Sequence, residues 1–401
     1  MSHQPLKNFR VLDLSNVLAG PFCAYQHALM GAEVIKVESP QGGDLARRLG
    51  ADPEAAAKLM GISFLAVNAG KQSITLNFKH AEGKAILKKM VADADVLVEN
   101  FRPGVMKRLG LDYDVLKEIN PGLVYCAISG FGQDGPWSDR PAYDQIIQGL
   151  SGLMSVTGDA DTAPLRAGFP VCDTIGGMAA AFAIAAALAG KARSGEGCMI
   201  DVSMLESTLA SMGWVVSNYL STGKAPQPMG NENMTAAPSG AFKTGDGLLN
   251  IAANEQKQYE TLCVAIGQPD LKSNVRFASR EARKQNRNAL KTEIEAGLAT
   301  QSAAEWETRL NAAGVPSGQI LSVPEILAEA QVGGRQFVVE IDHVPGLDKP
   351  AHVTRGGFLI NGNPMQPALP PPQLGAHTAT WLHNLGYDDE EIARLTKEKV
   401  I

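Results

Sequence analysis

The chain has 401 residues, enough for two domains, with 45% hydrophobic and 19% charged residues, as in ordinary globular proteins. Its formal net charge of −6 argues against a general nucleic-acid binder, which would carry a basic surplus, but does not exclude a local basic pocket for a phosphorylated ligand. The five dispersed cysteines have no CxxC spacing, which favours reduced thiols over a disulfide framework or a zinc site.

The N-terminal stretch is polar and has no apolar core of the kind found in secretory signals. The most apolar stretch, Met178 to Leu188, is shorter than a bilayer span. We therefore expect a soluble, cytoplasmic protein with no membrane partner.

The first 130 residues alternate between apolar runs and amphipathic segments. Strands are expected at 10–14, 33–38, 73–77, 95–99 and 123–128, and helices at 21–30, 80–92 and 113–119. This alternation predicts βαβ units and a mostly parallel sheet buried on both faces, an α/β fold. The turn after the first strand lacks GxGxxG, so the usual dinucleotide fingerprint is missing.

The rest of the chain changes character after a Pro-containing linker at 221–229. Before the linker we expect an Ala-rich helix at 178–189 and another helix at 200–220. After it we expect short strands around 247–252, charged amphipathic helices, a helix at 321–336, short strands from Phe337 and a final helix at 388–397. The change in composition predicts a second, smaller domain.

Asp173 is the main candidate for chemistry. It lies in the Gly-containing run 168–177, directly before the Ala-rich helix, where its carboxylate would face the positive end of the helix dipole. Most such aspartates are helix caps. The surrounding glycines, which clear space for a substrate, favour a carboxylate held ready for chemistry.

Two other segments carry candidate ligand contacts. Asn100, Phe101 and Arg102 follow the fourth strand, where they could hydrogen-bond, stack on an adenine and pair with a phosphate, although an ordinary strand-to-helix loop would look the same. Tyr143 and Asp144 offer a hydroxyl and a second carboxylate, but most such pairs are structural. No HxxxH, HExxH or GxSxG motif is present, so neither a metal site nor a nucleophile elbow is indicated.

Together these segments resemble the class III CoA-transferase family. The resemblance runs through Val11–Ser15 with Ala19–Pro21, Gly31–Glu38, Val98–Gly104, Gly130–Gly132, Gly195–Gly197 with Ile200–Ser203, and Leu374–His377. So many matches in order are more specific than any single motif.

The resemblance implies a fold, a ligand and an assembly. It implies a Rossmann-like large domain in 1–220, a linker and smaller α+β domain in 221–329, and a C-terminal segment, 330–401, that returns to the large domain. It implies an interlocked homodimer and coenzyme A or acyl-CoA as substrate, with no metal. It also assigns the nucleophile to Asp173 and the CoA contacts to Val17, Leu18, Ala19, Leu76, Lys79, Asn100, Phe101, Arg102, Arg108, Tyr143 and Asp144.

Three departures bear on specificity. Ser39 and Pro40 stand where the family often has an arginine for the adenine, and Leu18 stands where formyl-CoA transferase has a glutamine. The formyl-CoA transferase glycine run is replaced by the segment 230–240, with Asn231 and Gly240 as candidate substrate contacts. Formyl-CoA/oxalate specificity is therefore not expected.

The chemistry expected from the resemblance is CoA transfer through an aspartyl anhydride and an aspartyl-CoA thioester. Backbone N–H groups near Gly176 or in segment 230–240 are the candidate oxyanion donors. Arg166 could recognise a second carboxylate on a succinyl-type donor, or be a solvated loop residue. The alternatives are an α-methylacyl-CoA racemase, disfavoured because Tyr143 stands where its histidine would be, and a non-catalytic CoA-binding protein.

Overall fold

A computed structural model of the protein describes residues 4–401, which divide into two compact units. The first unit contains the residues up to Leu153, Ala167–Gly223 and Ala330–Ile401. The second contains Met154–Arg166 and Lys224–Glu329. Each unit has its own hydrophobic core.

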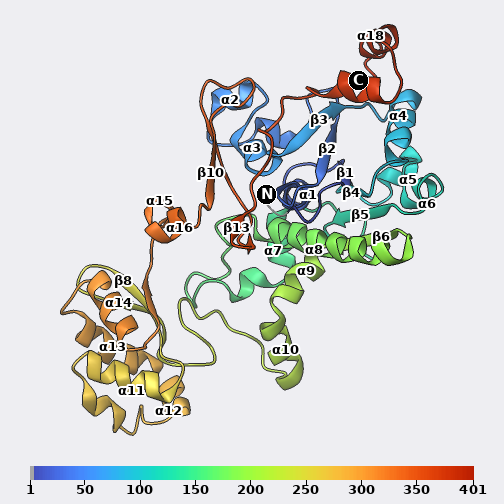
Figure 1. The fold of residues 1–401 in the computed structure, drawn as a ribbon. Helices are drawn as coiled ribbons and strands as arrows, with labels where there is room; N and C mark the ends of the chain where they lie inside the picture. Colours follow the sequence, from blue (N-terminus) through green and yellow to red (C-terminus); the bar gives the residue numbers. More distant parts are fainter. Residues whose placement is uncertain (1–3) are drawn as a thin grey trace. The chain divides into compact units, whose positions relative to one another are not determined.

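The first unit is built on a six-stranded parallel sheet, which confirms the predicted α/β fold (Figure 1). The spatial order of the strands is β3-β2-β1-β4-β5-β6. The strands are β1 (Arg10–Asp13), β2 (Glu33–Glu38), β3 (Lys71–Thr75), β4 (Val96–Glu99), β5 (Val124–Ser129) and β6 (Cys198–Ser203). The order reverses beside β1, so β1 and β4 flank the switch point at which open α/β sheets bind ligands.

Alternating side chains of the strands face two separate helical layers. Leu12 and Leu97 belong to a cluster with α4 and the C-terminal helices, whereas Val11 and Val96 belong to a cluster with α1 and α8. Both faces are therefore buried, as the continuous apolar strands require. The helices of this unit are α1 (Ala19–Leu29), η1 (Leu45–Arg48), α2 (Pro53–Ala57), α3 (Ile62–Asn68), α4 (Ala81–Val91), α5 (Val105–Leu109), α6 (Tyr113–Lys117), α7 (Asp144–Leu150), α8 (Val171–Ser194), α9 (Met204–Ser211) and α10 (Gly213–Thr222).

The last part of the chain, 330–401, packs on the edge of this sheet. β3 is the edge strand here. The N–H of Thr75 in β3 donates to Oγ1 of Thr378 (3.0 Å), and Nε1 of Trp381 donates to Oε1 of Gln72 (2.6 Å). The elements here are α16 (Ala330–Gly334), β10 (Val338–Ile341), β11 (Ala351–Thr354), β12 (Leu359–Ile360), β13 (Asn363–Pro364), α17 (Thr378–Asn384) and α18 (Asp389–Lys397).

The second unit packs helices against a three-stranded antiparallel sheet, ordered β7-β8-β9. Its core centres on Trp306, which is buried and donates its Nε1–H to the carbonyl of Leu298 (2.7 Å). The elements are β7 (Ser239–Lys243), β8 (Leu248–Ala252), α11 (Gln256–Ala265), η3 (Pro269–Lys272), α12 (Arg280–Gln285), α13 (Arg287–Leu298), α14 (Ala303–Ala312), β9 (Ser317–Gln319) and α15 (Val323–Ala328); η2 (Leu153–Val156) lies where the chain passes between the units.

Three sequence-based expectations are wrong in detail. The helix expected at 200–220 starts later, because 200–203 belong to the edge strand β6 and α9 begins directly after that strand. The expected helix at 321–336 is two helices, α15 and α16, separated by Glu329 in an extended conformation (ψ 139°). The Ala-rich helix is α8, which has 24 residues rather than 12 and already contains Asp173.

Because α8 is so much longer than expected, the argument that the apolar stretch is too short to span a bilayer does not hold. By length and composition α8 is one candidate membrane-spanning helix among the described residues. The core helix of a soluble protein passes the same test. Here α8 packs on α1 and on strands β5 and β6 of the sheet, as a core helix would.

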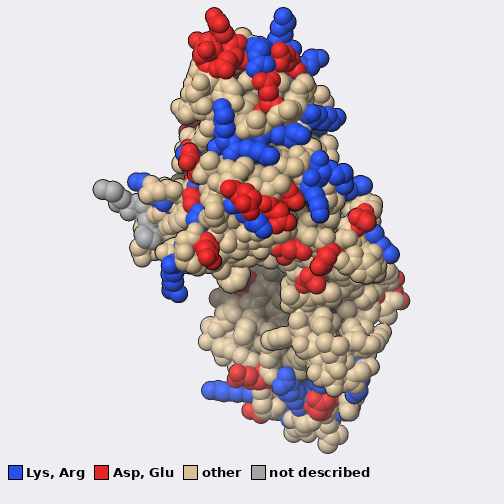
Figure 2. All heavy atoms as spheres, turned by 90° about the vertical axis from the view of Figure 1, so that its right-hand side faces the viewer, with Lys and Arg blue, Asp and Glu red and all other residues tan. Residues whose placement is uncertain are grey.

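The opposite layer, formed by α4, α5, α6 and α18, carries mixed charge on its outer surface. Figure 2 shows Lys and Arg interleaved with Asp and Glu over this face. Arg394 of α18, for example, pairs with Glu82 of α4 (2.7 Å). This is the pattern of a solvated helical layer.

Candidate active site

A cavity of about 230 Å³ opens at the carboxyl ends of the parallel strands, next to the switch point. Its walls come from the loops after β1, β4 and β5, and from the first residues of α8 and α9. The lining residues are Asn16, Val17, Leu18, Ala19, Asn100, Phe101, Arg102, Pro103, Ile128, Ser129, Gly130, Ser138, Arg140, Pro141, Ala142, Tyr143, Asp173 and Met204. The position is the one at which this class of sheet gathers ligands.

Asp173 lies in the first turn of α8, which begins after Pro170, and not before the helix as the sequence had suggested. It is not the cap of its own helix. That part is taken by Asp144 from α7, whose Oδ1 accepts the N–H of Cys172 (2.8 Å) and, at longer range, of Asp173 (3.4 Å). Oδ2 of Asp144 accepts from Nε2 of Gln148 (2.6 Å). The carboxylate of Asp173 is therefore released from capping and can face the cavity.

The surroundings of Asp173 make its ionised form costly. Burial raises the pKa of Asp173 to about 7, and the nearby charge of Asp144 adds to that rise. The N-terminus of α8 acts in the other direction, but burial and the like charge outweigh it. A strongly raised pKa in a cavity marks a candidate catalytic group, and here the geometry points to the same residue.

Two glycines let the start of α8 approach its neighbours closely. A Cβ at Gly177 would collide with the backbone oxygen of Ala19, and one at Gly176 would lie 2.9 Å from Cγ of Met204. These glycines therefore bring α8 against the first turn of α1 and against α9. Gly176 lies inside the helix, where an N–H is normally bonded to the carbonyl four residues back, so its expected role as an oxyanion donor loses support.

The loop after β1 is clamped in a strained conformation beside Asp173. Val17 has a φ of +66°, which is unfavourable for a β-branched residue. Its N–H donates to Oδ1 of Asp44 (2.9 Å), and the backbone N–H and C=O of Asn16 both bond to the side-chain amide of Asn100 (2.8 Å each). Strain of this kind persists only where surrounding contacts enforce it.

Asp44, which accepts the N–H of Val17, belongs to a group of buried charged side chains. Lys36 pairs with Asp44 (3.0 Å), and Lys71 pairs with Asp13 (2.8 Å); all four side chains are inaccessible to water. Burial acts to raise the pKa of Asp13, but the charges of Lys36 and Lys71 prevail and hold that pKa at about 2. The four charges therefore compensate one another inside the fold.

A second cavity, of about 310 Å³, shares Asn16 and Phe101 with the first. Its lining residues are Leu14, Asn16, Val37, Glu38, Ser39, Gly43, Leu76, Asn77, Phe78, Lys79, Phe101, Val105 and Leu109. It combines an apolar floor with the exposed ammonium group of Lys79. The two cavities are therefore neighbours within one unit.

Most of the predicted contacts line these two cavities. Val17, Leu18, Ala19, Asn100, Phe101, Arg102 and Tyr143 line the first together with Asp173, and Leu76, Lys79 and again Phe101 line the second.

Three predicted residues lie elsewhere. Asp144 is buried and caps α8, and lines neither cavity. Arg108 is exposed on α5, the helix whose Val105 and Leu109 border the second cavity. Arg166 is exposed and belongs to the second unit. Sequence reasoning missed Arg140, which lines the first cavity; its place three residues before Tyr143 was the available signal.

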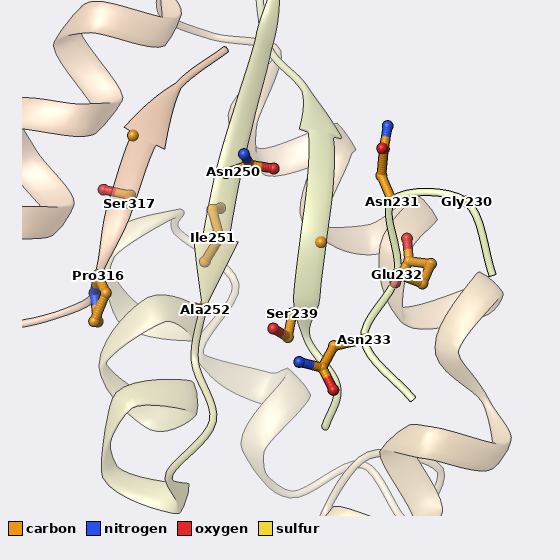
Figure 3. A pocket seen from close by; sticks show the side chains of 12 residues that line it. Gly230, Asn231, Glu232, Asn233, Ser239, Asn250, Ile251, Ala252, Pro316 and Ser317 are labelled. Atoms are coloured by element: carbon orange, nitrogen blue, oxygen red, sulfur yellow. The ribbon is translucent and has the colours of Figure 1, made fainter. Parts of the chain in front are cut away.

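Asn231 and Gly240, the remaining candidates, line a separate pocket of about 540 Å³ within the second unit (Figure 3). Asn231 and Glu232 lie on the loop beside β7, and Asn250 lies on β8. The loop can approach β7 because Gly240 has no Cβ, which would lie 2.7 Å from the carbonyl oxygen of Asn231. Glu232, which also lines this pocket, pairs with Lys291 (3.0 Å).

The chain is similar to known proteins over most of its length. Residues 6–378 match CoA-transferase family III. The chain is 37% identical to mouse succinyl-CoA:glutarate CoA-transferase, over 100% of this chain and 91% of the relative. It is 38% identical to a succinate–glutarate CoA-transferase of Agrobacterium fabrum, over 95% and 96%. A crystal structure of a CAIB/BAIF family protein from Brucella suis is similar in fold, with a TM-score of 0.82, 34% identity and coverage of 96% of this chain and 100% of that one.

Proposed function

Since the chain belongs to CoA-transferase family III, we propose that it transfers CoA from succinyl-CoA, or another dicarboxylyl-CoA, to a carboxylic acid, with Asp173 as the covalent carrier. The family membership makes the protein a CoA-transferase that acts on CoA thioesters and carboxylates. The observation that carries the rest is the carboxyl group of Asp173, free of capping and facing a cavity at the switch point of the sheet.

The proposed first half-reaction forms an aspartyl-CoA thioester. An oxygen of the Asp173 carboxylate attacks the thioester carbonyl of the donor, the C–S bond breaks, and the electron pair leaves with CoA as a thiolate. The thiolate then attacks the Asp173 carbonyl of the mixed anhydride, and the acyl group leaves as a carboxylate. The second half-reaction runs these steps in reverse with the acceptor, so protons and electrons balance and Asp173 is regenerated.

The cavity suits these steps in two ways. Burial makes the carboxylate of Asp173 costly to ionise, so it loses little solvation when it attacks. Leu18, the N-cap residue of α1, and Ala19, its first residue, line the cavity, and the first N–H groups of a helix have no intrahelical partners. We place the oxyanion donors there, which is consistent with the clamped loop that precedes this turn.

The second cavity is proposed to hold the nucleotide end of CoA. Phe101 reaches both cavities, and Lys79 supplies a positive charge at the far end. CoA would then extend from Lys79, past Asn16 and Phe101, with its sulfur near Asp173. This arrangement keeps the contacts that the resemblance implied, except for Asp144 and Arg108, which line neither cavity.

The racemase alternative is not favoured. None of the residues that line the Asp173 cavity, all within the described part of the chain, is a histidine. Tyr143 is 67% exposed, and an exposed phenol is a weak base near neutral pH. Deuterium incorporation at the α-carbon without any acceptor would favour the racemase.

We also propose a homodimer of interlocked chains. Large apolar side chains are exposed on α8 and α10: Trp214 is 86% exposed, Phe182 76% and Leu220 75%. An exposed apolar group of this size typically marks a protein–protein interface. Light scattering coupled to size-exclusion chromatography tests the stoichiometry, and a monomeric wild type would contradict the proposal.

The function is tested by incubating purified protein with succinyl-CoA or acetyl-CoA and a panel of carboxylic acids, and identifying the CoA products by mass spectrometry. We expect transfer from succinyl-CoA to at least one dicarboxylic acid. Asp173→Ala should abolish transfer while CoA still binds, because the side chain carries the acyl group but is one of many wall residues. Turnover at the wild-type rate by this variant would refute the mechanism.

A further inference from the structure

Arg140 is a charged wall residue of the Asp173 cavity to which neither the resemblance nor the proposed mechanism gives a role. It lies in the loop between β5 and α7. Among the described residues, the charged ones that line the cavity are Arg102, Arg140 and Asp173. An ionised Asp173 thus leaves the cavity with a surplus of one positive charge, and an acylated Asp173 leaves a surplus of two.

The guanidinium of Arg140 stacks on an aromatic ring of its own loop. Its Cζ lies 4.4 Å from the ring centroid of Trp137, and Trp137 packs edge-on against Phe131 with a centroid distance of 5.7 Å. The N–H of Arg140 donates to the carbonyl of Trp137 (2.9 Å), which closes the turn. A guanidinium stacked in this way keeps its N–H edge available for a planar anion and loses little freedom on binding one.

Arg140 has no carboxylate partner within residues 4–401, for no acidic oxygen of the described chain lies within 4.0 Å of its side chain. Other arginines of the same unit do have one: Arg47 pairs with Glu38 (2.7 Å) and Arg394 with Glu82 (2.7 Å). The five N–H groups of an arginine match a carboxylate or a phosphate in bidentate geometry. An anionic group of the ligand is therefore the partner that the cavity lacks.

We infer that Arg140 binds the free carboxylate at the far end of the acyl group, and so selects dicarboxylyl over monocarboxylyl CoA thioesters. This rests on the proposed function, which puts the CoA phosphates at the Lys79 end of the second cavity, beyond Asn16 and Phe101. Arg140 instead shares the first cavity with Asp173, at the reacting end of the ligand. The carboxylate also restores a negative charge whenever Asp173 is acylated and has lost its own.

Arg140 thus takes the role that the sequence suggested for Arg166, the recognition of a second carboxylate. Arg166 is exposed in the second unit and is not part of the cavity that contains Asp173. It is thus a matched control: the same residue type, also exposed, outside the cavity.

The test compares two non-reactive thioethers of CoA that differ only at the end of the chain. S-(3-carboxypropyl)-CoA has the terminal carboxylate of succinyl-CoA, and S-butyl-CoA has a methyl group in its place. Dissociation constants are measured by isothermal titration calorimetry for the wild type, Arg140→Met, Arg140→Lys and Arg166→Met. Circular dichroism and the CoA affinity itself report whether each variant is folded.

We expect the wild type and Arg166→Met to bind the carboxylated analogue about 10- to 100-fold more tightly than the butyl analogue, as one charge-assisted bidentate contact warrants. Arg140→Met should abolish this ratio without weakening S-butyl-CoA, and Arg140→Lys should give an intermediate ratio. An unchanged affinity ratio in Arg140→Met overturns the inference. An equal loss of affinity for both analogues and for CoA also overturns it, because such a loss would indicate a phosphate contact. A wild type that binds both analogues equally overturns it while the proposed function stands, whereas a wild type that binds neither analogue nor CoA overturns both.

Discussion

Replacing Asp173 by asparagine should stabilise the protein and inactivate it at the same time. Burial and the charge of Asp144 raise the pKa of Asp173 from its ordinary value of 3.8 to about 7 in the folded protein. Below about pH 4 the carboxyl group is protonated in both the folded and the unfolded chain, so it does not affect the free energy of unfolding. Between pH 4 and 7 only the unfolded chain ionises, so the wild type loses stability as the pH rises. Above about pH 7 the loss is complete and constant.

The size of this loss follows from the shift of about three pKa units. At about 1.4 kcal/mol per unit the upper bound is about 4 kcal/mol, and because Asp173 is partly accessible to water we expect roughly 2–4 kcal/mol. Asparagine has nearly the same shape but no charge, so it escapes the penalty. The stabilisation of Asp173→Asn should therefore be close to zero near pH 4 and reach its full value above pH 7.

The measurement is differential scanning calorimetry of both proteins from pH 4 to pH 8.5. We expect the melting temperature of the variant to exceed that of the wild type by roughly 4–8 °C at pH 8.5, and by much less at pH 4. Asp139→Asn, which removes the same charge from an exposed loop position, should show no such pH-dependent gain. A difference between Asp173→Asn and wild type that does not change with pH would refute the argument that Asp173 is held at a cost.

Three further predictions follow from the same contacts. The kcat/KM of the wild type should rise with pH through about 7 as Asp173 ionises. Asp144→Asn keeps the capping oxygen but removes the like charge, so it should shift this rise in the pH–rate profile to lower pH. A profile that does not shift would exclude coupling between the two carboxyl groups. Gly177→Ala should destabilise the protein and lower kcat, because a Cβ there collides with the backbone at the start of α1. Gly190 lies on the same helix and a Cβ there has nothing within 4 Å, so Gly190→Ala should stabilise the protein by about 0.5–1 kcal/mol. Equal effects of the two variants in thermal melts would contradict the packing argument. Lys36→Met should cost about 3–5 kcal/mol in denaturant titrations because it leaves the buried Asp44 without its cationic partner, whereas Asp13 keeps Lys71. A cost below about 1 kcal/mol would contradict the argument that these buried charges depend on one another.

The parallel sheet could be predicted because its central strands are apolar runs that can be recognised in the sequence. Strands buried on both faces need nearly continuous apolar residues, and 96–98 and 124–128 are such runs, each followed by a polar residue. Edge strand β6 has no such signal: its first four residues alternate between half-buried and exposed, and it passes directly into α9 at Ser203. Without a turn between them, the strand and the helix look like one long helix in the sequence.

The start of α8 was misplaced because Gly176 and Gly177 normally argue against a helix. Here they lie within it, since the close approach to Ala19 and Met204 requires a helix surface without side chains. Packing between helices is a tertiary property that local propensity does not contain. The same limit explains Asp144, which a family pattern assigns to the ligand but which the fold uses to cap another helix.

The site as a whole was easier to locate than its individual roles. The resemblance identified segments, and the strand order brings these segments to one edge of the sheet. It could not identify Arg140, because the value of that residue lies in what surrounds it: a stacked ring and a cavity with no other anion than Asp173. Such features become visible only when the loops are folded around the cavity.

The covalent role of Asp173 is tested most directly by trapping the acyl or CoA adduct during turnover. Enzyme mixed with succinyl-CoA is treated with hydroxylamine or with borohydride, digested, and analysed by mass spectrometry for the peptide that contains residue 173. We predict a hydroxamate, or a side chain reduced to an alcohol, at Asp173 and only when the thioester is present. An enzyme that turns over under these conditions while the peptide stays unmodified would contradict the proposal that this carboxylate carries the transferred group.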